Sequence, residues 1–221
     1  MSALGENKLD GLWGGSPTLD YWKNGDYMNN NSNFGDEKFI YRIGMKSKPV
    51  HINNILDGYI VIDNEKIPFK RRSVLKKRAS VVLPEKFTIM SKDLAEAKYP
   101  SVHRPGEIYT NPETTINFSL THTREAATNE GIPETKDTIQ QMVMRMHPAS
   151  KVFDSDVLDV SGLQIGYFDF VTPALDMNVY NVTSVCSIDK RLVVGSFNCP
   201  HESMDDWKPL LLQMLHSIEV C

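Results

Sequence analysis

Residues 80–123 have the sequence SVVLPEKFTIMSKDLAEAKYPSVHRPGEIYTNPETTINFSLTHT and decide the fold class of this chain. The stretch begins with a short apolar run at 80–83, which predicts a strand, and Pro84 predicts the turn that ends it. Near its end, Ile116, Phe118 and Leu120 alternate with polar residues. This alternation predicts a strand that is buried on one face.

A short helix is predicted between these two strands. Ser91 is a favourable N-cap residue for a helix over 92–98, and Pro100 prevents that helix from continuing. The following loop carries His103 and Arg104 between prolines, and Tyr109 stands close behind. Because loops held between rigid elements often carry binding residues, these three are candidate binding residues. The alternative for Arg104 is that it binds carbonyl groups of its own loop.

The second half of the chain predicts one helix followed by an antiparallel meander. Ile139, Met142, Val143 and Met146 recur at helical spacing and Pro148 closes the element. The methionines are interpreted as core packing rather than as a binding groove. Strands are predicted at 151–158, 164–171, 177–187 and 191–197. Their connections are too short for crossover helices, so neighbouring strands should be antiparallel.

The last helix has the strongest periodicity in the chain. Its apolar residues are Trp207, Leu210, Leu211, Met214, Leu215 and Ile218, and carboxylates crowd its start. This pattern predicts a helix that lies flat on the sheet and buries one face. Pro209 lacks an N–H group, so the helix is expected to begin near Asp206, with the proline in its first turn.

Residues 37–78 predict a basic β extension. Strands are expected at 39–43, 59–62 and 67–70, and Pro68 predicts that the last of these is an edge strand. Residues 37–80 hold eleven Lys or Arg against four acids, whereas the whole chain has 24 Lys or Arg and 28 Asp or Glu. The cluster, which includes Arg71 and Arg72, is either a face for an acidic partner or nucleic acid, or a solvated strand pair beside an acidic domain. The second interpretation is favoured.

Residues 1–36 predict an irregular arm. They are rich in Gly, Asn, Ser and Asp, a composition that cannot bury enough surface to order itself unaided. The arm nevertheless carries Trp13, Tyr21 and Trp22, which bring large apolar area at modest entropic cost. These aromatic residues are predicted to dock, either on the chain's own domain or on a partner or second copy.

The order of elements and a few local features resemble one known fold. The features are Leu-Pro-x-x-Phe at 83–87, Tyr-Pro-x-x-x-Arg-Pro at 99–105 and Ile-Tyr-Thr-Asn at 108–111. Together with the strand, helix, meander and final helix, they make residues 79–220 similar to the Mog1/PsbP-like superfamily, which includes the DcrB-like bacterial proteins. The resemblance implies an α+β fold in which an antiparallel sheet is flanked by helices, an α/β/α sandwich. It does not explain residues 1–78.

Few residues suggest a catalytic, metal-binding or cofactor-binding site. The six histidines form no metal motif, and Cys199-Pro200-His201 lacks a matching pair of ligands. Phosphate-loop and dinucleotide fingerprints are absent, so no cofactor is predicted. Three widely spaced cysteines, the lack of a signal-peptide pattern and the lack of a long apolar run predict a cytoplasmic protein with no membrane span.

These observations favour a non-enzymatic function. Members of the superfamily are largely binding or accessory proteins: a Ran-binding transport factor, photosystem II extrinsic subunits, bacterial lipoproteins and chaperones for type VI secretion effectors. The resemblance therefore implies a protein-binding adaptor or chaperone-like accessory protein, whose partner is another protein or a second copy. A link to a bacterial secretion system is part of this expectation. The alternative is a structural subunit of a secretion apparatus or phage-like particle that docks through the arm. Nucleic acid is a disfavoured partner, because the rest of the chain is acidic.

Overall fold

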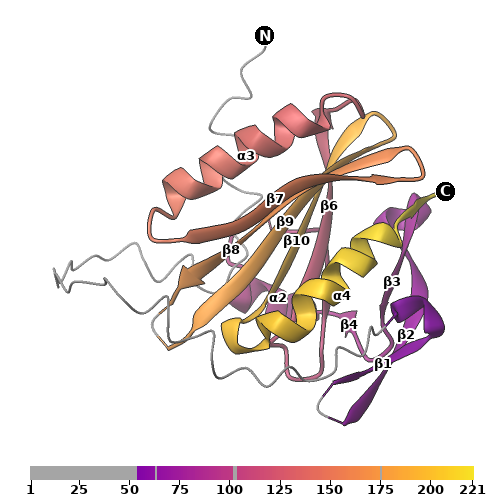
Figure 1. The fold of residues 1–221 in the computed structure, drawn as a ribbon, viewed down its shortest axis with the longest axis vertical. Coiled ribbons are helices and arrows are strands. Elements are labelled where there is room, and N and C mark those ends of the chain that lie inside the picture. The colour runs from indigo at the N-terminus through magenta and orange to yellow at the C-terminus, as the bar shows by residue number, and fades with distance from the viewer. Residues whose placement is uncertain (1–53, 63, 102–103, 175) are drawn as a thin grey trace, which may run out of the picture.

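Two antiparallel sheets form the framework of the protein (Figure 1). The structure, a computed structural model, describes residues 54–62, 64–101, 104–174 and 176–221. The larger sheet has seven strands in the order β4-β5-β6-β10-β9-β8-β7. Its strands are β4 (Thr88–Ile89), β5 (Glu107–Thr110), β6 (Asn117–Ala126), β7 (Lys151–Val160), β8 (Leu163–Pro173), β9 (Asn178–Ile188) and β10 (Arg191–Pro200). Every neighbouring pair is antiparallel, which confirms the predicted meander.

The smaller sheet joins segments that are far apart in the sequence. Its four strands are β1 (Tyr59–Ile62), β2 (Glu65–Val74), β3 (Ala79–Pro84) and β11 (Glu219–Val220), in that order. β1 and β2 come from the predicted basic extension, whereas β3 and β11 come from the predicted domain. The expected strand at 39–43 lies outside the described residues.

Helices cover both faces of the seven-stranded sheet. Side chains at successive positions of a strand point to opposite faces of the sheet. In β8, Phe168 and Phe170 pack in one apolar cluster, while Ile165 and Tyr167 pack in another. The first face is covered by α3 (Ile132–Met146), and α2 (Lys92–Lys98) packs near β5 through Tyr99. The second face is covered by α4 (Met204–His216) and the small sheet. The predicted α+β fold with a helix-flanked antiparallel sheet is confirmed.

The helix α3 begins at Ile132, and its buried stripe differs in part from the expected one. Its buried residues are Ile132, Lys136, Ile139 and Val143. Met142 and Met146, which the sequence placed in the stripe, are only half-buried. The helix runs very close to β8 at Gly166, where an added Cβ would lie 2.8 Å from Cβ of Lys136. Glycine at this position lets the helix approach the sheet.

The helix α4 buries the apolar face that its periodicity predicts. Trp207, Leu210, Leu211, Met214 and Leu215 are all buried in the core shared by the two sheets. The Trp207 ring lies 5.8 Å from that of Phe87 and 6.0 Å from that of Phe197 between centroids. Burial of side chains of this size contributes about 1.5–3 kcal/mol each. The helix therefore joins the two sheets into one core.

The structure corrects the expected place of Pro209. The helix α4 begins at Met204, two residues before the expected start, so Pro209 lies inside it and beyond its first turn. The short 3-10 turn η4 (His201–Ser203) leads directly into Met204. Tertiary burial of the apolar face outweighs the local cost of the proline.

The prediction that Pro68 marks an edge strand is wrong, because β2 lies between β1 and β3. Pro68 sits where the ladder to β3 ends, since the last β2–β3 pair is Phe69 with Pro84. Its carbonyl still accepts from the backbone N–H of Glu85 at 2.7 Å. The Glu85 carbonyl, opposite the missing Pro68 N–H, accepts from the Arg72 guanidinium at 2.7 Å instead. A side chain thus supplies the donor that the proline lacks.

Candidate functional site

The candidate residues chosen from sequence do not gather at one place. Trp13, Tyr21, Trp22 and His103 lie outside the described residues. Arg71 and Arg72 belong to β2, Tyr109 belongs to β5, and Arg104 lies in the segment before β5. Arg104 binds back to α2, where its guanidinium lies 3.5 Å from the Glu96 carboxylate.

The basic side chains of β2 make contacts that hold the small sheet together. Arg71 donates to the Ser217 carbonyl at 2.9 Å and forms an ion pair with Glu219 of β11 at 2.9 Å. Lys70 pairs with Glu85 at 2.9 Å, which lowers the pKa of that carboxyl. Lys70 and Arg71 therefore have structural partners. The basic residues that are clustered in the sequence do not form one surface in the fold.

The loop between β2 and β3 has an uncommon backbone. Leu75, Lys76 and Lys77 form the turn η3 (Leu75–Lys77) and have φ values of 52°, 56° and 69°. Residues with a β-carbon rarely adopt this left-handed conformation in succession, because each costs roughly 1–2 kcal/mol. The Leu75 side chain is buried in the core, while both lysines are exposed.

The carboxylate of Glu107 holds this turn in place. It accepts the backbone N–H of Leu75 at 3.1 Å through one oxygen and that of Lys76 at 3.3 Å through the other. The Tyr109 hydroxyl donates to the same carboxylate at 3.2 Å. Burial and the neighbouring Glu107 raise the pKa of Tyr109 to about 12, and the positive charge of Arg72 opposes this shift. Of the predicted residues, Arg72 and Tyr109 thus come together, beside a carboxylate that sequence reasoning missed.

Further cations surround the turn. Arg78 forms an ion pair with Asp189 at 3.0 Å, which joins the turn to the hairpin between β9 and β10. In that hairpin Arg191 donates to the Arg124 carbonyl at the end of β6. We call this end the basic pole, which consists of Lys76, Lys77, Arg78, Arg124, Lys190 and Arg191. In Figure 1 the β2–β3 hairpin and the C-terminal strand lie together at this end of the small sheet.

A charged cluster around one buried carboxylate lies where α4 crosses the large sheet. Asp169 is 1% exposed, and its carboxylate lies 2.6 Å from the Lys208 ammonium and 2.8 Å from the Tyr180 hydroxyl. It also accepts the backbone N–H of Asp154 at 2.5 Å, and the Asp154 carboxylate pairs with Lys208. Burial alone would lower the pKa of Lys208, but its hydrogen bonds to Asp154 and Asp169 raise it. All these groups are satisfied by one another, so the cluster acts as a tether for α4.

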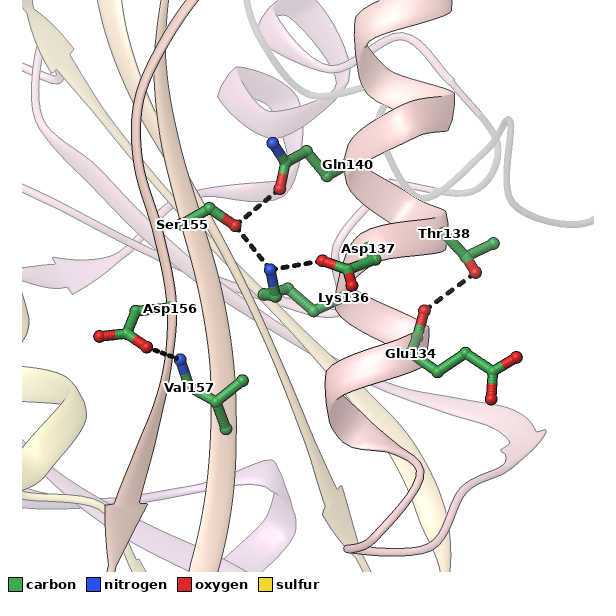
Figure 2. A network of polar contacts seen from close by, with 8 residues as sticks. All are labelled: Glu134, Lys136, Asp137, Thr138, Gln140, Ser155, Asp156 and Val157. Atoms are coloured by element: carbon green, nitrogen blue, oxygen red, sulfur yellow. Dashed lines mark hydrogen bonds and ion pairs between the residues drawn. The ribbon is translucent and has the colours of Figure 1, made fainter.

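A second polar network connects α3 to the edge strand β7 (Figure 2). The Lys136 ammonium donates to Ser155 Oγ and to the Asp137 carboxylate, both at 2.6 Å. Ser155 in turn donates to the Gln140 side chain at 2.7 Å. A serine beside a lysine suggests a nucleophile and its base, but here the ammonium is already paired with a carboxylate and the serine proton points to an amide. The network fastens the helix to the edge of the sheet.

Other reactive side chains are buried or separated. Among the described residues, no group of three His, Cys, Asp or Glu side chains is placed to hold a metal ion. Burial raises the pKa of the Cys186 and Cys199 thiols to about 12, which disfavours the reactive thiolate. Cys221 is exposed, and all three cysteines are free. No helix in the described part of the chain is both long and apolar enough to cross a membrane.

Comparison with known proteins identifies the fold. No family model matches the chain, and no curated protein matches it. Among solved structures, PsbP (CyanoP) from Synechocystis sp. PCC 6803 superimposes with a TM-score of 0.51 and 14% identity, over 69% of this chain and 92% of that one. LpqN, described as involved in cell envelope biogenesis of Mycobacterium tuberculosis, gives a TM-score of 0.44 and 6% identity, over 73% of this chain and 97% of that one. The protein has the Mog1/PsbP-like fold, as the sequence resemblance predicted.

Proposed function

We propose that this protein is a non-enzymatic accessory protein that binds another protein. The observation that supports this most is the way the fold uses its charged groups. The buried Asp169 carboxylate, the buried Lys136 ammonium and the half-buried Lys208 ammonium all make contacts that fasten helices to the sheet. The exposed lysines of the basic pole, by contrast, project from a backbone turn that is held in a costly conformation.

The surface for binding is not a face of the large sheet. A layer of α2 and α3 covers one face, and α4 with the small sheet covers the other. A partner therefore meets the ends and edges of the sheets. The predicted arm with Trp13, Tyr21 and Trp22 is a second contact in this proposal, and its docking on a partner or a second copy remains a prediction.

Truncation of the N-terminal arm tests the proposal. Deleting residues 1–36 should leave thermal unfolding cooperative but weaken self-association in light scattering, or the capture of a defined partner from the native cell. If the deletion abolishes cooperative unfolding, the arm belongs to the core and its role as a contact is wrong. If the purified full chain assembles on its own into large particles, the structural-subunit alternative replaces the adaptor. A chaperone role in secretion would require that the captured partner is a secreted effector.

A further inference from the structure

We infer that the basic pole is a docking surface for an acidic segment of a partner protein, in which several Asp or Glu side chains lie close together. This inference rests on the proposed function and names the chemistry of the partner. Lys76 and Lys77 of the pole are both exposed. Within the described residues neither ammonium group makes a hydrogen bond or an ion pair, whereas Lys70, Arg71 and Arg78 all do.

The backbone of the turn indicates that these two lysines are held in place for a purpose beyond folding. Glycine or asparagine would adopt the left-handed conformation at lower cost, yet the chain has lysine at both exposed positions. Strained backbone persists where the surroundings determine it, and such strain gathers at functional positions. Here the buried Leu75 side chain and the Glu107 carboxylate fix the turn from below. The lysines are therefore presented on a rigid support, which lowers the entropy lost when a ligand binds.

The surroundings of the turn extend the positive charge. Arg124, Lys190 and Arg191 add three cations, and all three are exposed. The carboxylates at this end are Glu107, which is bound to the turn, Asp189, which is paired with Arg78, Glu219, which is paired with Arg71, and Glu125, which also has a partner. Cations thus outnumber acids on a surface of a chain that has more acids than bases overall. A carboxylate-rich segment is the complement of such a surface.

Two other anionic partners fit the pole less well. Single-stranded nucleic acid binds through bases that stack on aromatic side chains. A membrane surface is held by apolar side chains as well as by charge. The exposed large apolar side chains among the described residues are Leu56, Tyr59, Val61, Ile89, Phe153, Met177 and Val220. Of these only Val220, in β11, lies beside the pole, next to Ala79 of β3. Among the described residues, the pole therefore offers charge with no large exposed aromatic side chain for stacking and with one exposed apolar side chain beside it.

Fluorescence anisotropy of the full chain tests the inference. The probe is a short fluorescein-labelled peptide rich in Glu and Asp, with a peptide of the same length carrying Gln and Asn as the uncharged control. We expect binding of the acidic peptide alone, weakening as salt is raised. The double variant K76Q/K77Q should weaken binding roughly threefold to tenfold, because each exposed charge contributes a modest amount.

The matched control is K86Q/K92Q, which removes the same charge from two exposed lysines away from the pole. It should bind the peptide like the wild type, and all variants should unfold at the same temperature. Equal binding by K76Q/K77Q and the wild type would overturn the inference, as would an equal loss in both double variants. Tighter binding of a single-stranded oligonucleotide or of phosphatidylserine vesicles through Lys76 and Lys77 would also overturn it. If deletion of residues 1–36 abolishes capture of the partner but K76Q/K77Q still captures it, the basic pole is not the docking surface. The adaptor function would then still hold.

Discussion

At the scale of single residues, the turn at Leu75–Lys77 shows how one carboxylate can stabilise a backbone that the local sequence disfavours. Two N–H groups of the turn point to Glu107, which comes from another strand and another part of the sequence. Hydrogen bonds to a charged acceptor contribute about 1.5–3 kcal/mol each. This gain is of the same order as the cost of the left-handed residues.

Substitution of Lys76 tests this balance. We expect the free energy of unfolding of Lys76→Gly to exceed that of Lys76→Ala by about 1 kcal/mol, because glycine adopts a φ of 56° without a β-carbon clash. Both variants lack the same ammonium, so alanine is the matched control. Urea unfolding of the two proteins measures the difference. A more stable alanine variant would show that the turn is not left-handed in solution.

At the scale of elements, the tether between α4 and the large sheet is the feature that sequence periodicity does not show. The apolar face of α4 fixes which side of the helix is buried, but Lys208 and Asp169 fix where the helix lies along the sheet. A buried ion pair adds little net stability, but it specifies one arrangement, since breaking it leaves an uncompensated charge.

Removing one partner of the tether should therefore be costly. We expect Lys208→Met to lower the free energy of unfolding by about 3–5 kcal/mol, because it leaves the Asp169 carboxylate buried without its cation. Lys92→Met, at an exposed position on α2, should change stability by less than about 0.5 kcal/mol. Adding Asp169→Asn to Lys208→Met should recover part of the loss in a double-mutant cycle. A cycle without coupling between the two positions would refute the tether.

At the scale of the whole molecule, the core that unites the two sheets carries two buried thiols. Cys186 and Cys199 have folded pKa values of about 12, against an ordinary value of 9.0. Above pH 9 the unfolded chain releases these protons while the folded chain keeps them. The unfolded state then binds fewer protons, so stability falls as pH rises from about 9 towards 12.

Chemical denaturation under reducing conditions between pH 7.5 and 10 measures this loss. Each buried thiol should contribute a decrease of about 1.4 kcal/mol per pH unit above its unfolded pKa. Cys186→Ala should reduce the slope, although it also lowers stability at every pH. Cys221→Ser, at the exposed cysteine, is the control and should leave the slope unchanged. A slope that is the same in all three proteins would contradict the buried, neutral state of Cys186.

The sequence by itself determined the elements whose signal is local. The period of the apolar residues in α4, the N-cap at Ser91 and the alternation around Phe118 each reflect hydrogen bonding and burial within one segment. Short connections then required antiparallel neighbours, and the fold class followed. The same reasoning failed at the two prolines. At Pro68 the Arg72 guanidinium supplies the donor that the proline lacks, so the strand need not lie at an edge. At Pro209 the packing of the whole apolar face of α4 outweighs the local cost of a proline inside a helix.

Only the tertiary structure decided which charges belong together. Glu107 and the Lys76 backbone are 31 positions apart, and Lys208 and Asp154 are 54 apart, so no local pattern connects them. The basic run of the sequence was divided in the same way, with Arg71 bound to the last strand and Lys76 left on an exposed turn. Electrostatic partners depend on distance in space, and distance in space is set by the packing of the two sheets around α4.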